Sequence, residues 1–200
     1  MPLAGDLCEG MLIALGWPEP HEFDALTAMR NRPEVRSRFL DPRPLEAEAN
    51  RQWLATGMQR PVEGLLSIRL RASGALCGMI GWSHWDPLDA SVEIGRLVVD
   101  HRLAVRQLRA AGIVRSETYP GIGVDATNTL RDFLFESLGL RTMFAVYIGD
   151  NARSARVNRL GGGRLVATQQ VARRDGSSVT LVRAELSRDE WLAVRKKARA

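Results

Sequence analysis

The sequence contains little cysteine and no long apolar run. Its two cysteines, Cys8 and Cys77, lie far apart and form no CxxC pair or disulfide framework. A reducing compartment, the cytoplasm, is therefore the expected location. The apolar run Met11–Leu15 is too short for a signal peptide, and no run approaches the length of a membrane span. We therefore expect no membrane partner.

Lysine is almost absent, because it occurs only at Lys196 and Lys197. The net charge of +5 consequently comes from arginine, which fits an acidic ligand such as a phosphorylated cofactor. Zinc-ligand spacing, an aromatic RNA-binding signature and Lys/Arg tracts are all lacking, so we expect no nucleic-acid partner. The 200 residues, 45% of them apolar, suffice for a core that needs no disulfide or metal, and no metal site is expected.

Apolar residues change their period along the chain, and this change predicts how strands and helices alternate. Residues 66–70 alternate apolar and polar side chains as in a strand, whereas residues 124–138 repeat at helical spacing. The predicted elements are a strand over Met11–Leu15, helices over Glu22–Arg30 and Pro44–Met58, strands over Leu66–Leu70, Leu76–Trp82 and Ser91–Val99, a short helical pattern within His101–Glu117, a helix over Val124–Leu138, a strand over Thr142–Ile148, a helix over Asn151–Leu160, a hairpin of Arg164–Arg173 and Ser178–Leu186, and a final helix. This order predicts an α/β fold with a mixed sheet in one domain, residues 1–200, with a core over about 11–186 and a C-terminal helix over 187–199.

A glycine-rich turn at Gly121 and Gly123 opens the helix that ends near Gly139. A Gly-x-Gly turn lets backbone N–H groups approach a ligand, and the helix N-terminus adds partial positive charge. The combination suits a pyrophosphate, although a glycine turn alone is a weak signal. A Rossmann-type dinucleotide site fits poorly, because the third glycine is missing and no strand directly precedes the turn.

With these elements in order, the sequence resembles the GNAT superfamily of acyl-CoA-dependent N-acetyltransferases and is most similar to its RimJ/RimL-like branch. The resemblance covers about Met11 to Leu186 and rests on the segments AMRNRPEVRSRFLDPRPLEAEANRQWL, LCGMIGWSHWD, ASVEIGRLVVD and NARSARVNRLGG. It implies the GNAT fold, a mixed and mostly antiparallel sheet flanked by helices and splayed between its fourth and fifth strands, Ser91–Val99 and Thr142–Ile148. It also implies acetyl-CoA as co-substrate, with the pantetheine arm in the gap.

The family's cofactor loop, Arg/Gln-x-x-Gly-x-Gly/Ala, falls on Thr118 to Gly123. Because threonine stands at the first position, one expected pyrophosphate contact is missing. A rival register that starts at Arg109 has the arginine but no long helix behind it, so we prefer the first. The cofactor-binding residues implied by the resemblance are Leu97, Val98, Val99, Thr118, Gly121, Ile122, Gly123, Val124, Asp125, Asn151, Ser154 and Arg156.

Relative to the family, His101–Glu117 contains an insertion. Arg109 or Arg115 on it either replaces the lost charge or is a solvated surface arginine. Arginines at every third residue from Arg153 to Arg159 either meet the adenosine 3′-phosphate of CoA or form a solvated helix face. Asn151 can both contact the pantetheine arm and cap the helix that it opens.

The amine substrate must lose a proton before it attacks, and a carboxylate is the usual base. Glu93 is the candidate, because a charged residue between apolar neighbours needs a reason and the family often places its base on this strand. The alternative is a solvated carboxylate paired with Arg69 or Arg183, in which case Asp86 or His84 is the candidate base. In the family, a backbone N–H, here near Leu97–Val98, would stabilise the oxyanion of the thioester.

The tyrosine that commonly protonates the CoA thiolate in this family is replaced by Asn158. Asparagine can hydrogen-bond a thiolate but has no proton of suitable pKa to donate. Tyr147, Ser154 or water could supply the proton, and a thiol with a pKa near roughly 8.5 needs only modest help.

The acceptor is expected to be a small-molecule amine or a protein N-terminus. Trp85, with His84 and Asp86 beside it, is the candidate for an acceptor pocket, because aromatic walls suit small substrates. An alternative function is a GNAT-fold acyl-CoA-binding or regulatory module with little or no turnover. Three departures from the family favour it: Thr118, Asn158, and the glycines Gly161–Gly163 where the family has Gly-Phe. Members of the family often form homodimers, so the resemblance also suggests a homodimer.

Overall fold

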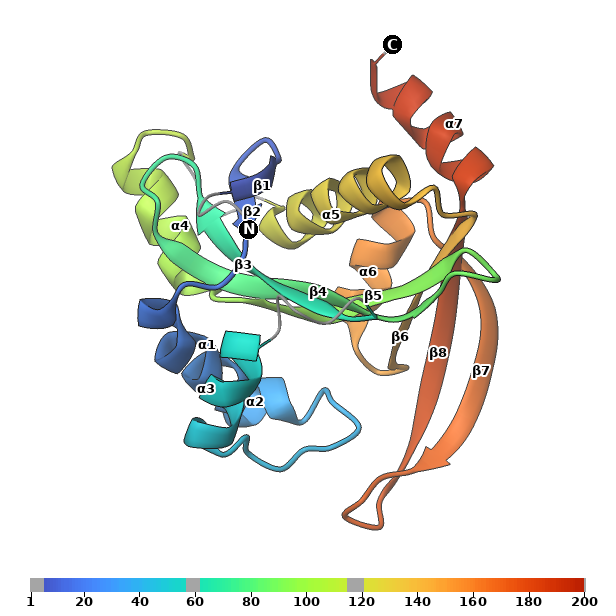
Figure 1. Ribbon diagram of the computed structural model, residues 1–200, viewed down its shortest axis with the longest axis horizontal. Coiled ribbons are helices and arrows are strands. Elements are labelled where there is room, and N and C mark those ends of the chain that lie inside the picture. The colour runs from blue at the N-terminus through green and yellow to red at the C-terminus, as the bar shows by residue number, and fades with distance from the viewer. Residues whose placement is uncertain (1–5, 57–61, 115–120, 200) are drawn as a thin grey trace.

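The structure, a computed structural model, describes residues 6–56, 62–114 and 121–199 (Figure 1). Within these ranges runs of strands and runs of helices follow one another along the chain. The elements are β1 (Asp6–Glu9), β2 (Ile13–Gly16), η1 (Pro20–Glu22), α1 (Phe23–Asn31), α2 (Pro33–Arg36), α3 (Ala47–Thr56), β3 (Gly64–Leu70), β4 (Leu76–Asp86), β5 (Ser91–Val99), α4 (His101–Ala110), α5 (Ile122–Leu138), β6 (Thr142–Ile148), α6 (Ala152–Leu160), β7 (Arg164–Ala172), β8 (Ser178–Ser187) and α7 (Arg188–Arg199).

One sheet contains all eight described strands in the order β1-β2-β3-β4-β5-β6-β8-β7. The β5–β6 pair is parallel and the other pairs are antiparallel. Helix α5 covers one face of the sheet, and α1, α2 and α3 cover the other (Figure 1). The prediction of an α/β fold with a mixed, mostly antiparallel sheet flanked by helices is therefore confirmed.

Strands β5 and β6 separate after a short parallel stretch. Their pairing runs from Ser91 to Glu93, and no later residue of β5 is paired with β6 in the described sheet. A bulge follows on β5, where Arg96 and Leu97 stand opposite a single residue of β4 and Arg96 has a φ of +55°. Because a bulge bends its strand away from a neighbour, it explains the predicted opening between these two strands.

The main differences from the predicted elements lie in the first half of the chain. Strand β1 was not predicted, because four residues with half-exposed side chains carry no clear alternation. Helix α3 begins at Ala47, three residues later than predicted, since the Glu46 carboxylate accepts the amide protons of Glu48 and Ala49 and so ends the preceding loop.

Apolar side chains form a cluster on each face of the sheet. The larger cluster joins the sheet to α4, α5 and α7, and Phe135 stacks on Trp191 within it at 4.9 Å between ring centroids. The smaller cluster joins α1 and α3 to Leu65, Met79 and Val98 of the sheet. In the described part of the chain, no helix has the length and apolar character needed to cross a membrane.

Candidate active site

The separated strands open onto two adjoining hollows. The larger, which we call the cofactor cleft, has a volume of about 800 Å³ and is lined by residues of β5, α2, α4, α5 and α6. The smaller, the catalytic hollow, has a volume of about 300 Å³ and lies where β5 and β6 part. Leu97, Asn151 and Ser154 line both, so the two hollows meet at these residues.

Most of the residues predicted to bind the cofactor line the cofactor cleft. They come from the end of β5, the start of α5 and α6, and they are Leu97, Val98, Val99, Gly123, Val124, Asn151, Ser154 and Arg156. Asn151 also caps α6, because its Oδ1 accepts the amide proton of Ser154 at 3.2 Å. Thr118 and Arg115 lie outside the described residues.

Helix α5 begins directly after Gly121, whose φ of +75° lies in the left-handed region that favours glycine. This placement supports the preferred register of the cofactor loop, since Gly112 of the rival register instead follows the end of α4. The amides of Val124 and Asp125 both donate to the Gly121 carbonyl at 2.9 Å. These two residues therefore contribute no spare amide to a diphosphate.

Two predicted cofactor residues have side chains committed elsewhere. Ile122 is fully buried in the core, so only its backbone could meet a ligand. The Asp125 carboxylate accepts the amide protons of Met11 at 3.0 Å and Leu12 at 2.7 Å. Asp125 therefore holds the turn between β1 and β2, and its position near the start of the helix could not reveal this from sequence.

Six arginines line the cofactor cleft. They are Arg102, Arg106 and Arg109 of α4, Arg153 and Arg156 of α6, and Arg38. Glu34 is the one acidic residue among the described residues that line it. Such a concentration of positive charge suits a ligand with several phosphates, as the arginine-based charge of the sequence predicts.

The described part of the predicted insertion, residues 101–114, begins with a packed helix, α4, rather than a solvated loop. Ala104 and Leu108 of α4 are fully buried against the core, and the arginines lie on the side that faces the cleft. Arg109 lines the cleft, which favours the alternative in which the insertion replaces the lost charge. Sequence reasoning missed Arg102 and Arg106, although their spacing of four residues places them on one helix face.

Glu93 lies in the catalytic hollow with its side chain 22% exposed. Its Oε2 lies 3.1 Å from Nδ1 of His84, which projects from the adjacent strand β4. Burial raises the pKa of the Glu93 carboxyl. The alternative pairing with Arg69 is wrong, because Arg69 pairs with Glu22 at 2.7 Å.

Three further predicted catalytic residues, Tyr147, Ser154 and Asn158, also line the catalytic hollow. Asn158 is already engaged, because its Oδ1 accepts a hydrogen bond from Arg131 Nη2 and its Nδ2 donates to the Ser154 carbonyl, both at 3.0 Å. Burial raises the pKa of the Tyr147 phenol, which makes it a weaker acid than a free tyrosine. It is still the most acidic of the three groups, because the protons of a serine hydroxyl and an asparagine amide are far less acidic.

The three residues predicted for the acceptor have different surroundings. His84 contacts Glu93, but its side chain is 74% exposed. Trp85 packs against the larger apolar cluster, and the Asp86 carboxylate accepts the amide protons of Leu88 and Asp89. Neither Trp85 nor Asp86 lines the cofactor cleft or the catalytic hollow, so the structure does not bring them to the site.

An opened sheet beside an arginine-lined cleft is the arrangement expected of an acyl-CoA-dependent acetyltransferase. The family model described as acetyltransferase (GNAT) domain matches residues 13–162, and the chain belongs to this family. The family uses acetyl-CoA as the acetyl donor. A cluster of three or more His, Cys, Asp or Glu residues that could hold a metal is not found among the residues described.

Several solved structures share the fold. A GCN5-related N-acetyltransferase from Brucella melitensis has a TM-score of 0.73 at 16% identity, over 98% of this chain and 85% of that chain. Spermidine N-acetyltransferase from Vibrio cholerae, in complex with CoA and spermine, has a TM-score of 0.74 at 12% identity, over 90% of this chain and 98% of that chain. The ribosomal L7/L12 α-N-protein acetyltransferase RimL, in complex with CoA, has a TM-score of 0.72 at 14% identity, over 90% of this chain and 96% of that chain. A search of curated proteins finds no match.

Proposed function

We propose that the chain is a single-domain N-acetyltransferase of the RimJ/RimL-like branch. It would move an acetyl group from acetyl-CoA to a primary amine, of a small molecule or a protein N-terminus, by direct transfer. The observation that carries the proposal is that the arginine-lined cofactor cleft meets a hollow containing a half-buried carboxylate, Glu93, at the point where β5 and β6 part. The resemblance to RimL supports the branch.

The cofactor cleft fits acetyl-CoA in both size and charge, and the bound thioester supplies an activated acetyl group. The arginines of α4 and α6 would hold its phosphates, and Asn151 and Ser154 line the passage to the catalytic hollow. Glu93 in its charged form would take a proton from the ammonium group, directly or through water, so that the neutral amine can attack the acetyl carbon.

Negative charge then develops on the acetyl oxygen as the new C–N bond forms. A backbone N–H near Leu97–Val98, next to the bulge of β5, would stabilise this charge. The C–S bond breaks, and the leaving sulfur would take a proton from Tyr147 or from water. Asn158 would hold α6 in place through Arg131 and take no part in proton transfer.

A second candidate function is an acyl-CoA-binding or regulatory module with little turnover. The hydrogen bond from Arg131 to Asn158 favours this second function. The tyrosine that usually donates the proton in the family is absent at this position, and the asparagine in its place is held by Arg131. One experiment separates the two functions: the protein is incubated with acetyl-CoA and pooled primary amines, and free thiol is followed. Repeated turnover supports the enzyme, whereas stoichiometric CoA binding by calorimetry without thiol release supports the module. Absence of CoA binding contradicts both.

The arginines of α4 give a first prediction. The double substitution Arg102→Gln/Arg106→Gln should raise the Kd for CoA by about 30-fold, because an exposed arginine that meets a phosphate is worth about 1 kcal/mol. Isothermal titration calorimetry measures this change. Arg159→Gln is the matched control, since Arg159 lies on α6 but does not line the cofactor cleft. If the double variant binds CoA as tightly as the control, the phosphates are not held by α4.

We also propose that the protein works in a reducing compartment and forms a homodimer. The free thiols of Cys8 and Cys77 support a reducing compartment such as the cytoplasm. A homodimer stays a prediction from the resemblance, which light scattering of the purified protein would test.

A further inference from the structure

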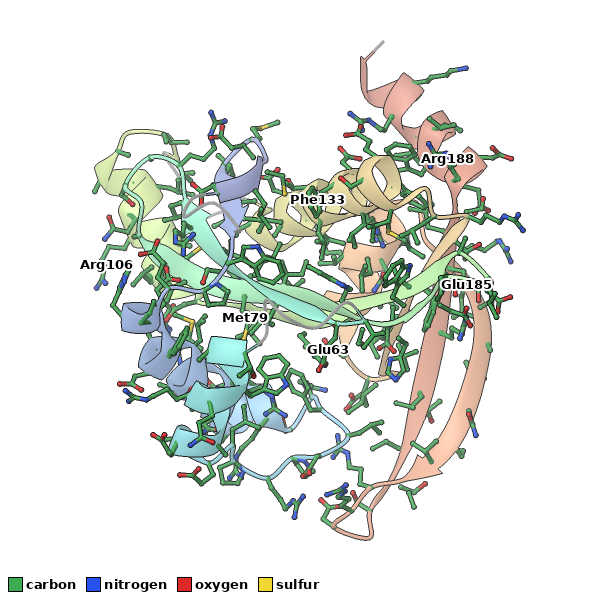
Figure 2. The ribbon with its side chains drawn as sticks, in the orientation of Figure 1. Glu63, Met79, Arg106, Phe133, Glu185 and Arg188 are labelled. Atoms are coloured by element: carbon green, nitrogen blue, oxygen red, sulfur yellow. The ribbon has the colours of Figure 1, made fainter. Side chains whose placement is uncertain are left out.

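A third hollow lies on the face of the sheet that α1 and α3 cover. This α1–α3 hollow has a volume of about 430 Å³ and adjoins the catalytic hollow, since Phe39 and Arg96 line both. Figure 2 shows Met79 of β4, and Glu63 just before β3, on the side of the sheet that α1 and α3 cover. Its apolar lining residues are Leu26, Phe39, Leu45, Trp53, Leu54, Leu65 and Met79. A hollow with such walls suits the carbon skeleton of a small molecule.

The α1–α3 hollow contains a buried arginine whose charge has no carboxylate partner. Arg30 lines the hollow and is 9% exposed, and it forms no ion pair with any residue that the structure describes. Its Nη2 donates to the Asp41 carbonyl at 3.2 Å, and its guanidinium lies 3.6 Å from the centroid of the Phe39 ring. Its Nη1 is closed to solvent and has no hydrogen-bond partner within the described ranges, so a ligand in the hollow meets this atom only when the guanidinium turns toward it. A buried guanidinium with an unused donor favours an anionic ligand.

The nearby carboxylates do not supply the missing partner. The Asp41 carboxylate accepts hydrogen bonds from Arg43 and lies 3.6 Å from Arg174. Glu46 also lines the hollow, but its oxygens accept the first amide protons of α3. The charge of Asp41 stabilises Arg30 without forming an ion pair with it, so the guanidinium can still take a carboxylate of a ligand as its partner.

A second arginine stands where the two hollows adjoin. Arg96 Nη2 donates to Glu63 Oε2 at 2.6 Å, and its Nη1 has no partner among the described residues. Its guanidinium lies 5.2 Å from the centroid of the Trp53 ring. Arg96 follows Glu93 by three residues on β5, so a ligand that reaches from Glu93 into the α1–α3 hollow passes it.

We propose that the α1–α3 hollow binds the body of the acceptor, and that the acceptor is a small apolar amine carrying a carboxylate. The amine lies at Glu93, the carbon skeleton packs between the sheet and Trp53, and the carboxylate pairs with Arg30. This inference rests on the proposed function for the place of the amine. It narrows the acceptor class, because a polyamine would place a second positive charge beside a buried arginine.

The test compares acceptors in matched pairs that differ only in the carboxylate. ω-Aminocarboxylates of increasing length, which separate the amine from the carboxylate as the proposed pose requires, are set against the alkylamines of the same length, with acetyl transfer followed by thiol release. We expect kcat/KM to be at least about tenfold higher for the better carboxylate of the panel than for its matched amine. Arg30→Met should remove this preference and keep the fold, because an apolar side chain of similar volume replaces a buried charge. A preference for amines without a carboxylate, or a preference that survives Arg30→Met, overturns the proposal.

A second variant blocks the hollow without touching the arginine. Ala49 of α3 lines the α1–α3 hollow with its side chain exposed, so Ala49→Trp should raise KM for the carboxylate acceptors and leave the Kd for CoA unchanged. Ala55→Trp is the control, since Ala55 is exposed on α3 and does not line the hollow. Equal KM values for the two variants would overturn the proposal.

A binding measurement separates this inference from the proposed function. Phenylbutyrate, which has no amine, is titrated into the protein alone and into Arg30→Met, and binding is followed by NMR chemical shifts. Binding to the wild type that Arg30→Met abolishes supports the site, even if no amine is ever acetylated. Absence of binding, or equal binding to both proteins, overturns the site whether or not the chain proves to be an acetyltransferase.

Discussion

Replacing Glu93 with glutamine is expected to lower kcat for acetyl transfer by about 10²–10⁴-fold, the range that a general base contributes. Glutamine keeps the size of the side chain and its contact with His84 but cannot accept the proton of the ammonium group. The Kd for CoA should not change, because Glu93 lines the catalytic hollow and not the cofactor cleft. Initial rates of thiol release and calorimetry measure the two quantities.

The pH dependence of the wild type follows from the same carboxylate. Burial raises the pKa of Glu93, and the adjacent His84, followed by the positive charges of Arg96 and Arg183, opposes that shift. Only the charged form can accept a proton, so kcat/KM should rise with pH through a pKa above the free value of roughly 4.3. The kcat/KM of Glu93→Gln should not show this rise with pH.

The stability of Glu93→Gln separates a catalytic role from a structural one. Because the pKa of the folded state is raised, the folded protein retains a proton that the unfolded chain has released, and stability falls as pH rises through that interval. At neutral pH the buried charge is therefore unfavourable, and Glu93→Gln should unfold at the same or a higher temperature. Glu136→Gln on α5 is the control, which should keep its activity because Glu136 is exposed and lines neither the cofactor cleft nor the catalytic hollow. A wild-type kcat for Glu93→Gln would contradict the role of this residue.

Local sequence patterns predicted the elements because the apolar period along a strand or helix reflects which face is buried. They could not predict which residues would meet. Glu93 was found because a carboxylate between Val92 and Ile94 is unusual in a strand. The role of Asp125 was not, because its partners, Met11 and Leu12, lie more than a hundred residues away in the sequence. Arg30 carries no local signal either, since only the fold shows that it is buried without an ion pair to any described carboxylate.

The position of Asn158 shows the limit of a resemblance. The family commonly carries a tyrosine there, and the sequence predicts only that asparagine is a poor proton donor. The structure supplies the physical reason for asparagine, which is Arg131 on α5. Arg131 is 3% exposed, and burial lowers its pKa to about 10. Because water cannot reach its N–H groups, they need hydrogen-bond acceptors within the protein, and α6 supplies them. Asn158 and the Gly161 carbonyl provide them.

Gly161→Ala is therefore expected to lower the free energy of unfolding by about 3–5 kcal/mol, the combined effect of overpacking and of lost hydrogen bonds to a buried charge. A Cβ at this position would overlap Nη1 of Arg131. The guanidinium cannot move away freely, because Nη1 donates to the Gly161 carbonyl and Nη2 to Asn158, each at 3.0 Å. Denaturant unfolding measures the loss. Gly149→Ala is the matched control, since a Cβ there meets only ordinary contacts, and it should change stability by less than about 1 kcal/mol.

A double-mutant cycle tests whether Arg131 is the cause. In an Arg131→Met background the overlapping group is a flexible apolar side chain, so Gly161→Ala should destabilise the protein less than it does in the wild type, with a coupling of about 1–3 kcal/mol. Equal effects in both backgrounds would show that Gly161 is required for another reason. Helix α6 also carries Ser154 and Arg156, which line the cofactor cleft. Gly161→Ala should therefore weaken CoA binding as well as stability, because the contact between Arg131 and α6 positions these two residues.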